Sequence, residues 1–392
     1  MEPILELEQR LARYDPARYP VQHATTRFHL GVVLADAGRV AEAIESLASA
    51  AELFDPDALP VEHAKALNAL GAAQRLAGEL EQAEASFERA AELFERSSLE
   101  QEHGAAFFNL GLVRRERDPA AAAECFRRAA ALLTGGPEAA AARELGATLL
   151  ALGELDEAMR TLERAVELAE RGDATGYGGA LNALGLARLA AGAAEEAIGS
   201  FRQAAGAHPR AVRPAEFAMA KANLSLAYEQ HGDAPRARLS ARQALGVADP
   251  PAPVAAQAAA VLARIGEATA HDLLRVLEQE AQASWEGIVR EELARSAEAP
   301  PDVRRVDAAA WIDDSSVERA EAWLGGLLEL PPERIELLIR SALEALGSRE
   351  TAVKEHFRAD VSRAAGRFHV PQLLRLEEIF RRIAAELEEP WS

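Results

Sequence analysis

The sequence predicts an all-α protein made of stacked helix–turn–helix repeats, followed by a small helical region. Three observations predict this fold class. Alanine, the strongest helix former, supplies much of the 49% hydrophobic content, whereas aromatic residues make up only 5%. A short pattern recurs six times between residues 21 and 250. Beyond a break at AEAPPDV, residues 297–303, the chain reads as short helices that lack the pattern.

Each copy of the pattern has three markers with separate physical reasons. The first, usually a Leu-Gly pair in mid-helix, falls at Gly31, Gly71, Gly111, Gly146, Gly185 and Ser225. The second, seven residues later, falls at Gly38, Gly78, Asp118, Gly153, Gly192 and Gly232. The third is a pair of alanines seven residues apart, which begins at Ala43, Ala83, Ala122, Ala158, Ala197 and Ala237. A mid-helix glycine is tolerated where another helix comes within about 8 Å, and a second glycine suits the left-handed end of a helix.

Each copy is therefore a helix A, a turn and a helix B. The paired alanines lie on one face of helix B and meet helix A. Such a unit cannot bury its apolar face alone, so neighbouring units must stack.

This pattern resembles the tetratricopeptide repeat family over roughly residues 21–248. The resemblance implies a right-handed α–α superhelix. The domains we expect are a capping helix at 1–20, six repeats at 21–250, a degenerate seventh repeat and capping helix at 251–299, and a helical C-terminal domain at 300–392.

Partners of this family bind along a concave groove lined by helix A. By the family's pattern, the exposed positions lie six and three residues before the first marker and one and four after it. The candidate groove residues are Phe28, Asn68, Arg75, Phe108, Leu112, Arg115, Arg143, Asn182, Leu186, Leu189 and Leu226. The family's carboxylate clamp, which holds acidic C-terminal tails, lacks its second residue because Val32, Ala72 or Leu112 stands there. An apolar groove suits an amphipathic helix, and the protein's own C-terminal helices are the alternative occupant.

All four tryptophans, Trp285, Trp311, Trp323 and Trp391, lie in the last part of the chain. They form either the core of the C-terminal helices or a binding surface, since tryptophan anchors many interfaces. Trp311 and Trp391 stand in loop-like or terminal contexts, so these two are the candidates for a C-terminal interface. A homodimer through these helices is one possible assembly.

The formal charge of −20 bears on the partners. Such a surface repels phosphate backbones and anionic lipids, so we expect no nucleic acid and no membrane partner. The expected partner is a protein or peptide with an amphipathic or basic helical segment. The chain opens without a signal-peptide pattern and has no apolar run near the roughly 20 residues of a membrane span. We therefore expect a cytoplasmic protein.

No motif for catalysis is present: there is no phosphate-binding glycine loop, nucleophile elbow or zinc-protease helix. His23, His63 and His103 recur at the start of helix A, but a repeat spacing of roughly 10 Å is too wide to share a zinc ion. We expect no cofactor, no metal and no enzymatic activity. The sequence predicts a non-catalytic scaffold or adaptor. The alternatives are a regulatory receptor that binds a short peptide and changes conformation, and an enzyme whose chemistry lies in residues 300–392.

Overall fold

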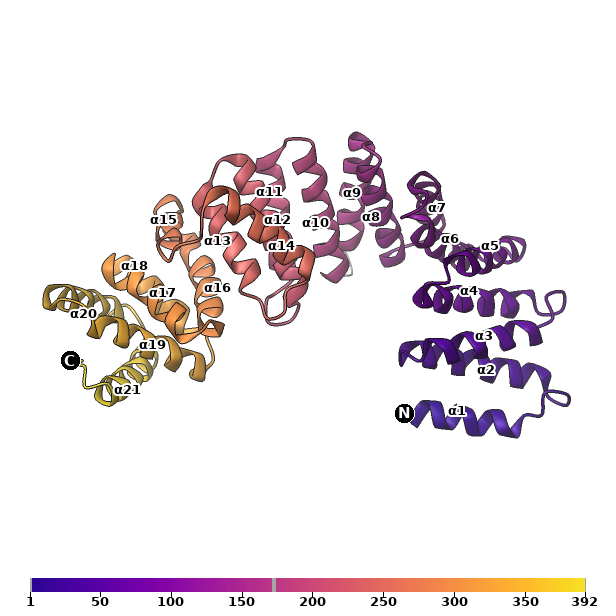
Figure 1. Ribbon diagram of the computed structural model, residues 1–392, viewed down its shortest axis with the longest axis horizontal. Coiled ribbons are helices and arrows are strands. Elements are labelled where there is room, and N and C mark those ends of the chain that lie inside the picture. The colour runs from indigo at the N-terminus through magenta and orange to yellow at the C-terminus, as the bar shows by residue number, and fades with distance from the viewer. Residues whose placement is uncertain (1, 171–173, 392) are drawn as a thin grey trace. The chain divides into compact units, whose positions relative to one another are not determined.

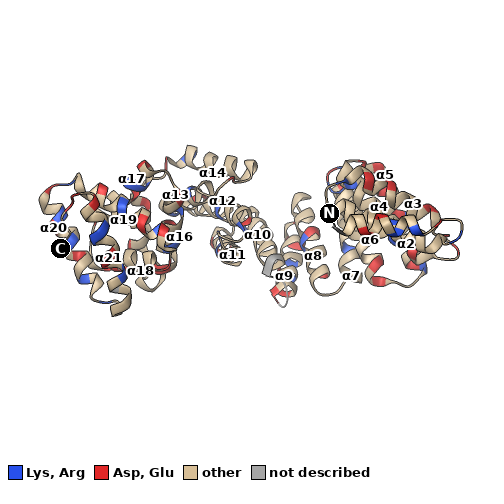
Figure 2. Ribbon diagram, turned by 90° about the horizontal axis from the view of Figure 1, so that it is seen from below, with Lys and Arg blue, Asp and Glu red and all other residues tan. Residues whose placement is uncertain are grey.

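A computed structural model describes residues 2–170 and 174–391 of the chain. All regular secondary structure in these residues is helical (Figure 1). The chain divides into two compact units, which we call unit 1 (Met1–Gly192) and unit 2 (Ala193–Ser392). Acidic and basic residues are interspersed along the helices of each unit (Figure 2).

Unit 1 is a stack in which each helix packs against the one before it and the one after it. Its helices are α1 (Glu2–Arg13), α2 (Pro20–Asp36), α3 (Val40–Leu53), α4 (Pro60–Ala77), α5 (Leu80–Arg96), α6 (Glu100–Arg114), α7 (Pro119–Leu132), α8 (Gly136–Ala151), α9 (Leu155–Glu170) and α10 (Ala174–Ala190). Helices α2, α4, α6, α8 and α10 are the A helices of successive repeats, and α3, α5, α7 and α9 are the B helices. This pairwise packing is that of a repeat solenoid, as predicted.

The repeat markers act as the sequence predicted. A Cβ atom on Gly111 would lie 2.6 Å from Cε1 of Phe126, so helices A and B approach too closely there for any side chain. All twelve paired alanines of the six copies are fully buried. Gly78 ends α4 in the left-handed conformation, with φ of 81°. Asp118 is the only second marker that is not a glycine. It is the N-cap residue of α7, where its carboxylate accepts a hydrogen bond from the Ala121 amide at 3.0 Å.

Unit 2 begins with repeat helices and continues into the C-terminal helices. The repeat part holds α11 (Ala194–Ala207), α12 (Pro214–His231), α13 (Ala234–Leu245), α14 (Ala252–Ile265) and α15 (His271–Gln279). The rest holds α16 (Trp285–Glu298), α17 (Pro301–Asp313), α18 (Val317–Leu328), α19 (Pro332–Gly347), α20 (Thr351–Ala365) and α21 (Val370–Glu386). The helices break at Ala299–Pro300, where the sequence predicted a boundary.

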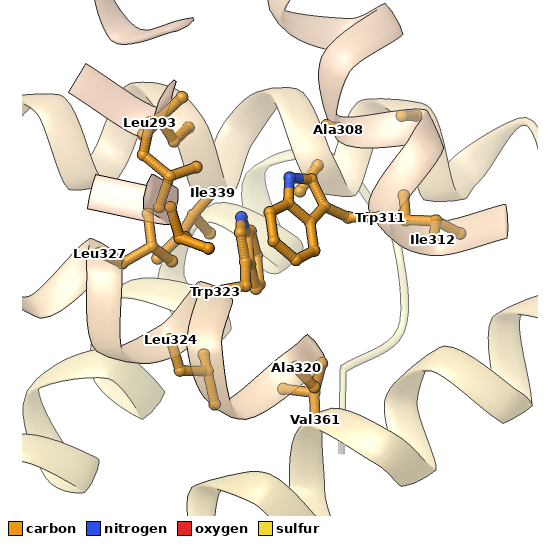
Figure 3. Packing of buried hydrophobic residues seen from close by; sticks show 14 of the residues in the cluster. Leu293, Ala308, Trp311, Ile312, Ala320, Trp323, Leu324, Leu327, Ile339 and Val361 are labelled. Carbon is orange, nitrogen blue, oxygen red and sulfur yellow. The ribbon is translucent and has the colours of Figure 1, made fainter. Parts of the chain in front are cut away.

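One hydrophobic core nevertheless crosses that break. It runs from Leu239 on α13 through α15 and α16 to Ala384 on α21. Figure 3 shows part of it, with the indole rings of Trp311 and Trp323 directed into the same space beside Leu327. Within unit 2, the C-terminal helices therefore pack as a continuation of the last repeat.

Buried ion pairs reinforce this attachment. Asp272 on α15 is fully buried, and Arg238 on α13 donates to it from Nη2 at 2.8 Å and from Nε at 3.1 Å. The Thr269 amide also donates to the Asp272 carboxylate at 2.7 Å. Nearby, Glu292 on α16 accepts from Arg242 of α13 and, at 2.7 Å, from Arg295. Each buried charge thus has a partner, which a charge removed from water requires.

The structure places one of the two candidate interface tryptophans, Trp311, differently from the expectation. Trp311 lies within α17 rather than in a loop, and it is 6% exposed in the core of unit 2. Its apolar ring is covered on all sides because α17 packs against α19 and α20. This burial favours the core role over the interface role. Trp391 is half-buried, and its ring stacks on Phe380 with centroids 4.5 Å apart.

Candidate functional site

The predicted groove positions of unit 1 form a partly exposed surface along the A helices, which we call the A face. Its predicted residues are Phe28, Asn68, Arg75, Phe108, Leu112, Arg115, Arg143, Asn182, Leu186 and Leu189. Most are half-buried, Arg115 is exposed and Asn182 is buried. Leu226, the last predicted residue, is half-buried on α12 of unit 2 and is described with that unit.

An apolar cavity of about 320 Å³ opens on the A face between α6 and α8. Three predicted groove positions, Ala105, Phe108 and Ala140, line it together with Leu133, Pro137 and two polar residues at the start of α6, Gln101 and Glu102. Phe108 is held by the core beneath, where its ring meets Phe126 edge-on at 5.8 Å between centroids. The cavity wall is therefore mostly carbon, with Gln101 and Glu102 at its polar edge, and the cavity is large enough for one apolar side chain of a partner.

Polar side chains flank the cavity on neighbouring A helices. The Asn109 amide donates to the Asn68 amide oxygen at 3.2 Å, which places α4 and α6 side by side. Arg115 and Arg143 both donate to Glu144, each at 2.8 Å. Arg115 and Arg143 thus share the single negative charge of Glu144, which leaves one positive charge uncompensated among these three residues.

Arg75, on α4, differs from those arginines. Its Nε atom is buried without a hydrogen-bond partner. No ion pair involves its guanidinium group among the described residues. Lys65 lies ten residues before Arg75 on the same helix, at another predicted groove position. It is exposed and likewise has no ion pair in residues 2–170 and 174–391. The A face therefore carries two cations without counter-ions.

The structure does not bring all predicted residues to one place. Phe28 packs on the core that contains Ala24, on the first A helix, and does not line the cavity. Leu186 and Leu189 lie on α10 at the other end of unit 1. The cavity and Arg75 are accordingly the parts of the A face where the chemistry is concentrated.

Five residues of this site were not predicted from the sequence: Leu133, Pro137, Gln101, Glu102 and Glu144. The first two follow from the third repeat, in which only residues 133–135 separate α7 from α8. The first markers of the third and fourth repeats, Gly111 and Gly146, are also only 35 residues apart, which is the shortest spacing between successive repeats. A short connection draws the end of helix B onto the A face, so this spacing was the available signal.

Burial shifts the pKa values of two titratable groups in the repeats next to the cavity. Burial lowers the pKa of His103, at the start of α6, and burial raises the pKa of the Cys125 thiol on α7. Both groups are therefore uncharged at neutral pH, and the thiol is a weak nucleophile in that form. Among residues 2–170 and 174–391, no three His, Cys, Asp or Glu side chains are grouped as metal ligands.

The family follows from a comparison with protein-family models. The model described as "Tetratricopeptide repeat" matches residues 7–58, 30–98 and 112–174. The chain contains tetratricopeptide repeats over these residues. Members of this family typically bind proteins or peptides and are generally non-catalytic. No curated protein matches the sequence of this tetratricopeptide repeat protein.

Several solved structures resemble this tetratricopeptide repeat protein. A Rap protein complexed with competence and sporulation factor is 14% identical, with a TM-score of 0.45, over 93% of this chain and 88% of that chain. YrrB, described as having an unusual peptide-binding site, is 22% identical, with a TM-score of 0.37, over 50% and 91%. BtubC from P. vanneervenii is 18% identical, with a TM-score of 0.45, over 52% and 89%. Similarity at this level assigns no function to the chain.

In the part of the chain that the structure describes, no helix combines the length and apolar character needed to cross a membrane.

Proposed function

We propose that this tetratricopeptide repeat protein is a non-catalytic scaffold or adaptor that holds a segment of a partner protein on the A face of unit 1. The observation that carries the proposal is the largely apolar cavity between α6 and α8. Its apolar wall consists of Ala105, Phe108, Leu133, Pro137 and Ala140, and Gln101 and Glu102 complete its lining. Water in such a cavity gains little from its walls, so an apolar side chain that replaces it contributes favourably to binding.

The geometry supports a protein segment as the occupant. The cavity is open toward solvent and belongs to a surface that continues over several A helices, whereas a small-molecule site encloses most of its ligand. Amide and guanidinium groups beside the cavity, on Asn68 and Arg143, offer donors to a peptide backbone or to polar side chains. One apolar anchor with flanking polar contacts is the usual arrangement of an interface hot spot.

Ala105→Glu tests the proposal, because it places a carboxylate at the cavity wall on a half-exposed helical position. Ala131→Glu is the matched control, since Ala131 is exposed on α7, a B helix. Wild type and both variants are used to capture partners from cytoplasmic extract, where we predict the protein to reside. Each captured protein is then purified and its affinity is measured by calorimetry.

A partner that binds wild type and Ala131→Glu equally, but binds Ala105→Glu about tenfold more weakly or worse, supports the scaffold. A partner that binds all three equally contradicts it and moves the interface to the C-terminal helices, beginning with Trp391. If no folded partner is captured and the protein instead binds a short peptide with a change in hydrodynamic radius, the receptor replaces the scaffold.

A further inference from the structure

The charge of the A face differs in sign from the charge of the whole chain. The four charged residues at the predicted groove positions of unit 1 are all cations: Lys65, Arg75, Arg115 and Arg143. One carboxylate, Glu144, accepts hydrogen bonds from two of them. A second carboxylate, Glu102, lines the cavity. The four cations outnumber these two carboxylates, so the surface keeps a local excess of positive charge within a protein whose formal charge is −20.

Arg75 is the cation that most needs a partner. It is half-buried and forms no ion pair among the described residues, and its Nε donor is buried without a hydrogen bond. A partner can therefore compensate its charge only through the two terminal nitrogens of the guanidinium group. Carboxylates satisfy a guanidinium group best, because two parallel N–H···O bonds fit its planar fork. Neighbouring arginines already show this preference, since Arg115 and Arg143 both bind Glu144.

We propose that the partner segment on the A face carries a carboxylate side chain that pairs with Arg75 and an apolar side chain that enters the cavity at Phe108. This inference rests on the proposed function and specifies the chemistry of the partner. It revises our expectation of a basic segment, because a basic residue would meet like charges along α4, α6 and α8. A nucleic acid is disfavoured because a polyanion is repelled by the net charge of the protein.

The fold also sets the spacing between these two side chains. Asn68 and Phe108 occupy equivalent positions of successive repeats, and α4 and α6 run parallel because each is antiparallel to α5. Arg75 lies seven residues beyond Asn68, which is about 10 Å along the helix axis. Neighbouring helices are about 10 Å apart, so the two sites are separated by about 14 Å. An extended segment spans this with about four residues, and a helical one with about nine.

Selection from a phage-displayed library of random peptides tests the proposal. Peptides of about 12 residues exceed the span that either conformation needs. The full-length chain is used as wild type, Arg75→Glu, Arg75→Lys and Ala105→Glu. Arg96→Glu is the control, because Arg96 is exposed at the end of α5, a B helix, and changes the net charge equally. Circular dichroism verifies that each variant keeps its helical content.

Wild type is expected to select peptides that combine Asp or Glu with Leu, Ile, Phe or Trp at the predicted spacing. Arg75→Glu is expected to keep the apolar residue and to select Lys or Arg in place of the acid. A wild-type peptide should bind Arg75→Glu about tenfold more weakly or worse, and should bind Arg75→Lys and Arg96→Glu with losses of only a few fold.

The failures of the two proposals are distinguishable. Peptides that depend on Ala105 but contain no acid, or that bind Arg75→Glu as tightly as wild type, overturn the pairing with Arg75 and leave the groove intact. The absence of any peptide that distinguishes wild type from Ala105→Glu overturns both the proposed function and this inference.

Discussion

At the scale of single residues, Gly111 and Gly199 predict opposite effects of the same substitution. Alanine at 111 would place a Cβ atom 2.6 Å from the fully buried ring of Phe126, which has no room to move. Overpacking of this kind costs about 1–3 kcal/mol. Alanine at 199, within α11, meets nothing within 4 Å and should stabilise the helix by about 0.5–1 kcal/mol. Thermal unfolding followed by circular dichroism checks the two signs, and stabilisation by Gly111→Ala would contradict the close approach of the helices.

His103 predicts a pH dependence of unit 1. Burial lowers its pKa in the folded protein below the value of about 6.5 in an unfolded chain. Below pH 6.5 the unfolded chain therefore gains a proton that the folded protein does not, and the free energy of unfolding falls as the pH falls through this window. His103→Phe, which keeps an aromatic ring beside Phe107, should reduce the loss in melting temperature between pH 7.5 and pH 5.5. Equal losses in wild type and the variant would assign the pH dependence to other groups.

Residue identities explain why some of the site was predictable. Arg75 and Phe108 were found because the repeat fixes which positions of helix A face outward, whatever residue stands there. Glu144 was missed because it lies just outside those positions, and only the structure shows two arginines reaching it. The sequence also could not predict that Arg75 lacks an ion pair among the described residues, since it does not show which of the many carboxylates lie near it.

At the scale of elements, the ion pair between α13 and α15 predicts how firmly the C-terminal helices are held. Asp272→Asn removes the charge that compensates Arg238, and breaking a buried pair costs about 3 kcal/mol or more. Glu229→Gln is the control, since its partner Arg264 is half-exposed and such pairs contribute less than about 1 kcal/mol. Urea unfolding followed by tryptophan fluorescence checks both, because all four tryptophans lie in unit 2. Equal costs would show that the burial of Asp272 does not matter.

The helices themselves were largely predictable, while their grouping was not. Three of the C-terminal helices begin at Pro301, Pro332 and Val370, near prolines that the sequence provides, and α18 begins at Val317, directly after its cap Ser316. Trp311 was placed in a loop-like context because acidic and serine residues follow it, although α17 continues to Asp313. Which helix faces meet depends on contacts between residues far apart in the chain. For that reason the core that joins α13 to α21 had no local signal in the sequence.

At the scale of the whole molecule, the formal charge of −20 and the cationic A face predict two effects of salt on the affinity for an acidic peptide. Salt favours binding by speeding association, and it opposes binding by speeding dissociation. An acidic peptide selected on wild type approaches a protein of like net charge, which slows association at low salt. Once bound, its carboxylate pairs with Arg75 over a short distance. Added salt shortens the Debye length from about 10 Å at 0.1 M to about 3 Å at 1 M, and so weakens both the repulsion and the pair.

The association and dissociation rate constants should therefore both rise with salt, as measured by stopped-flow fluorescence with a labelled peptide. In Arg75→Gln the association rate constant should still rise, because the net charge remains large, but the dissociation rate constant should lose most of its salt dependence. An association rate constant that falls with salt in wild type would mean that the cations of the A face govern the approach. In that case the local field of Lys65, Arg75, Arg115 and Arg143, and not the charge of the whole chain, would set how an acidic partner finds the groove.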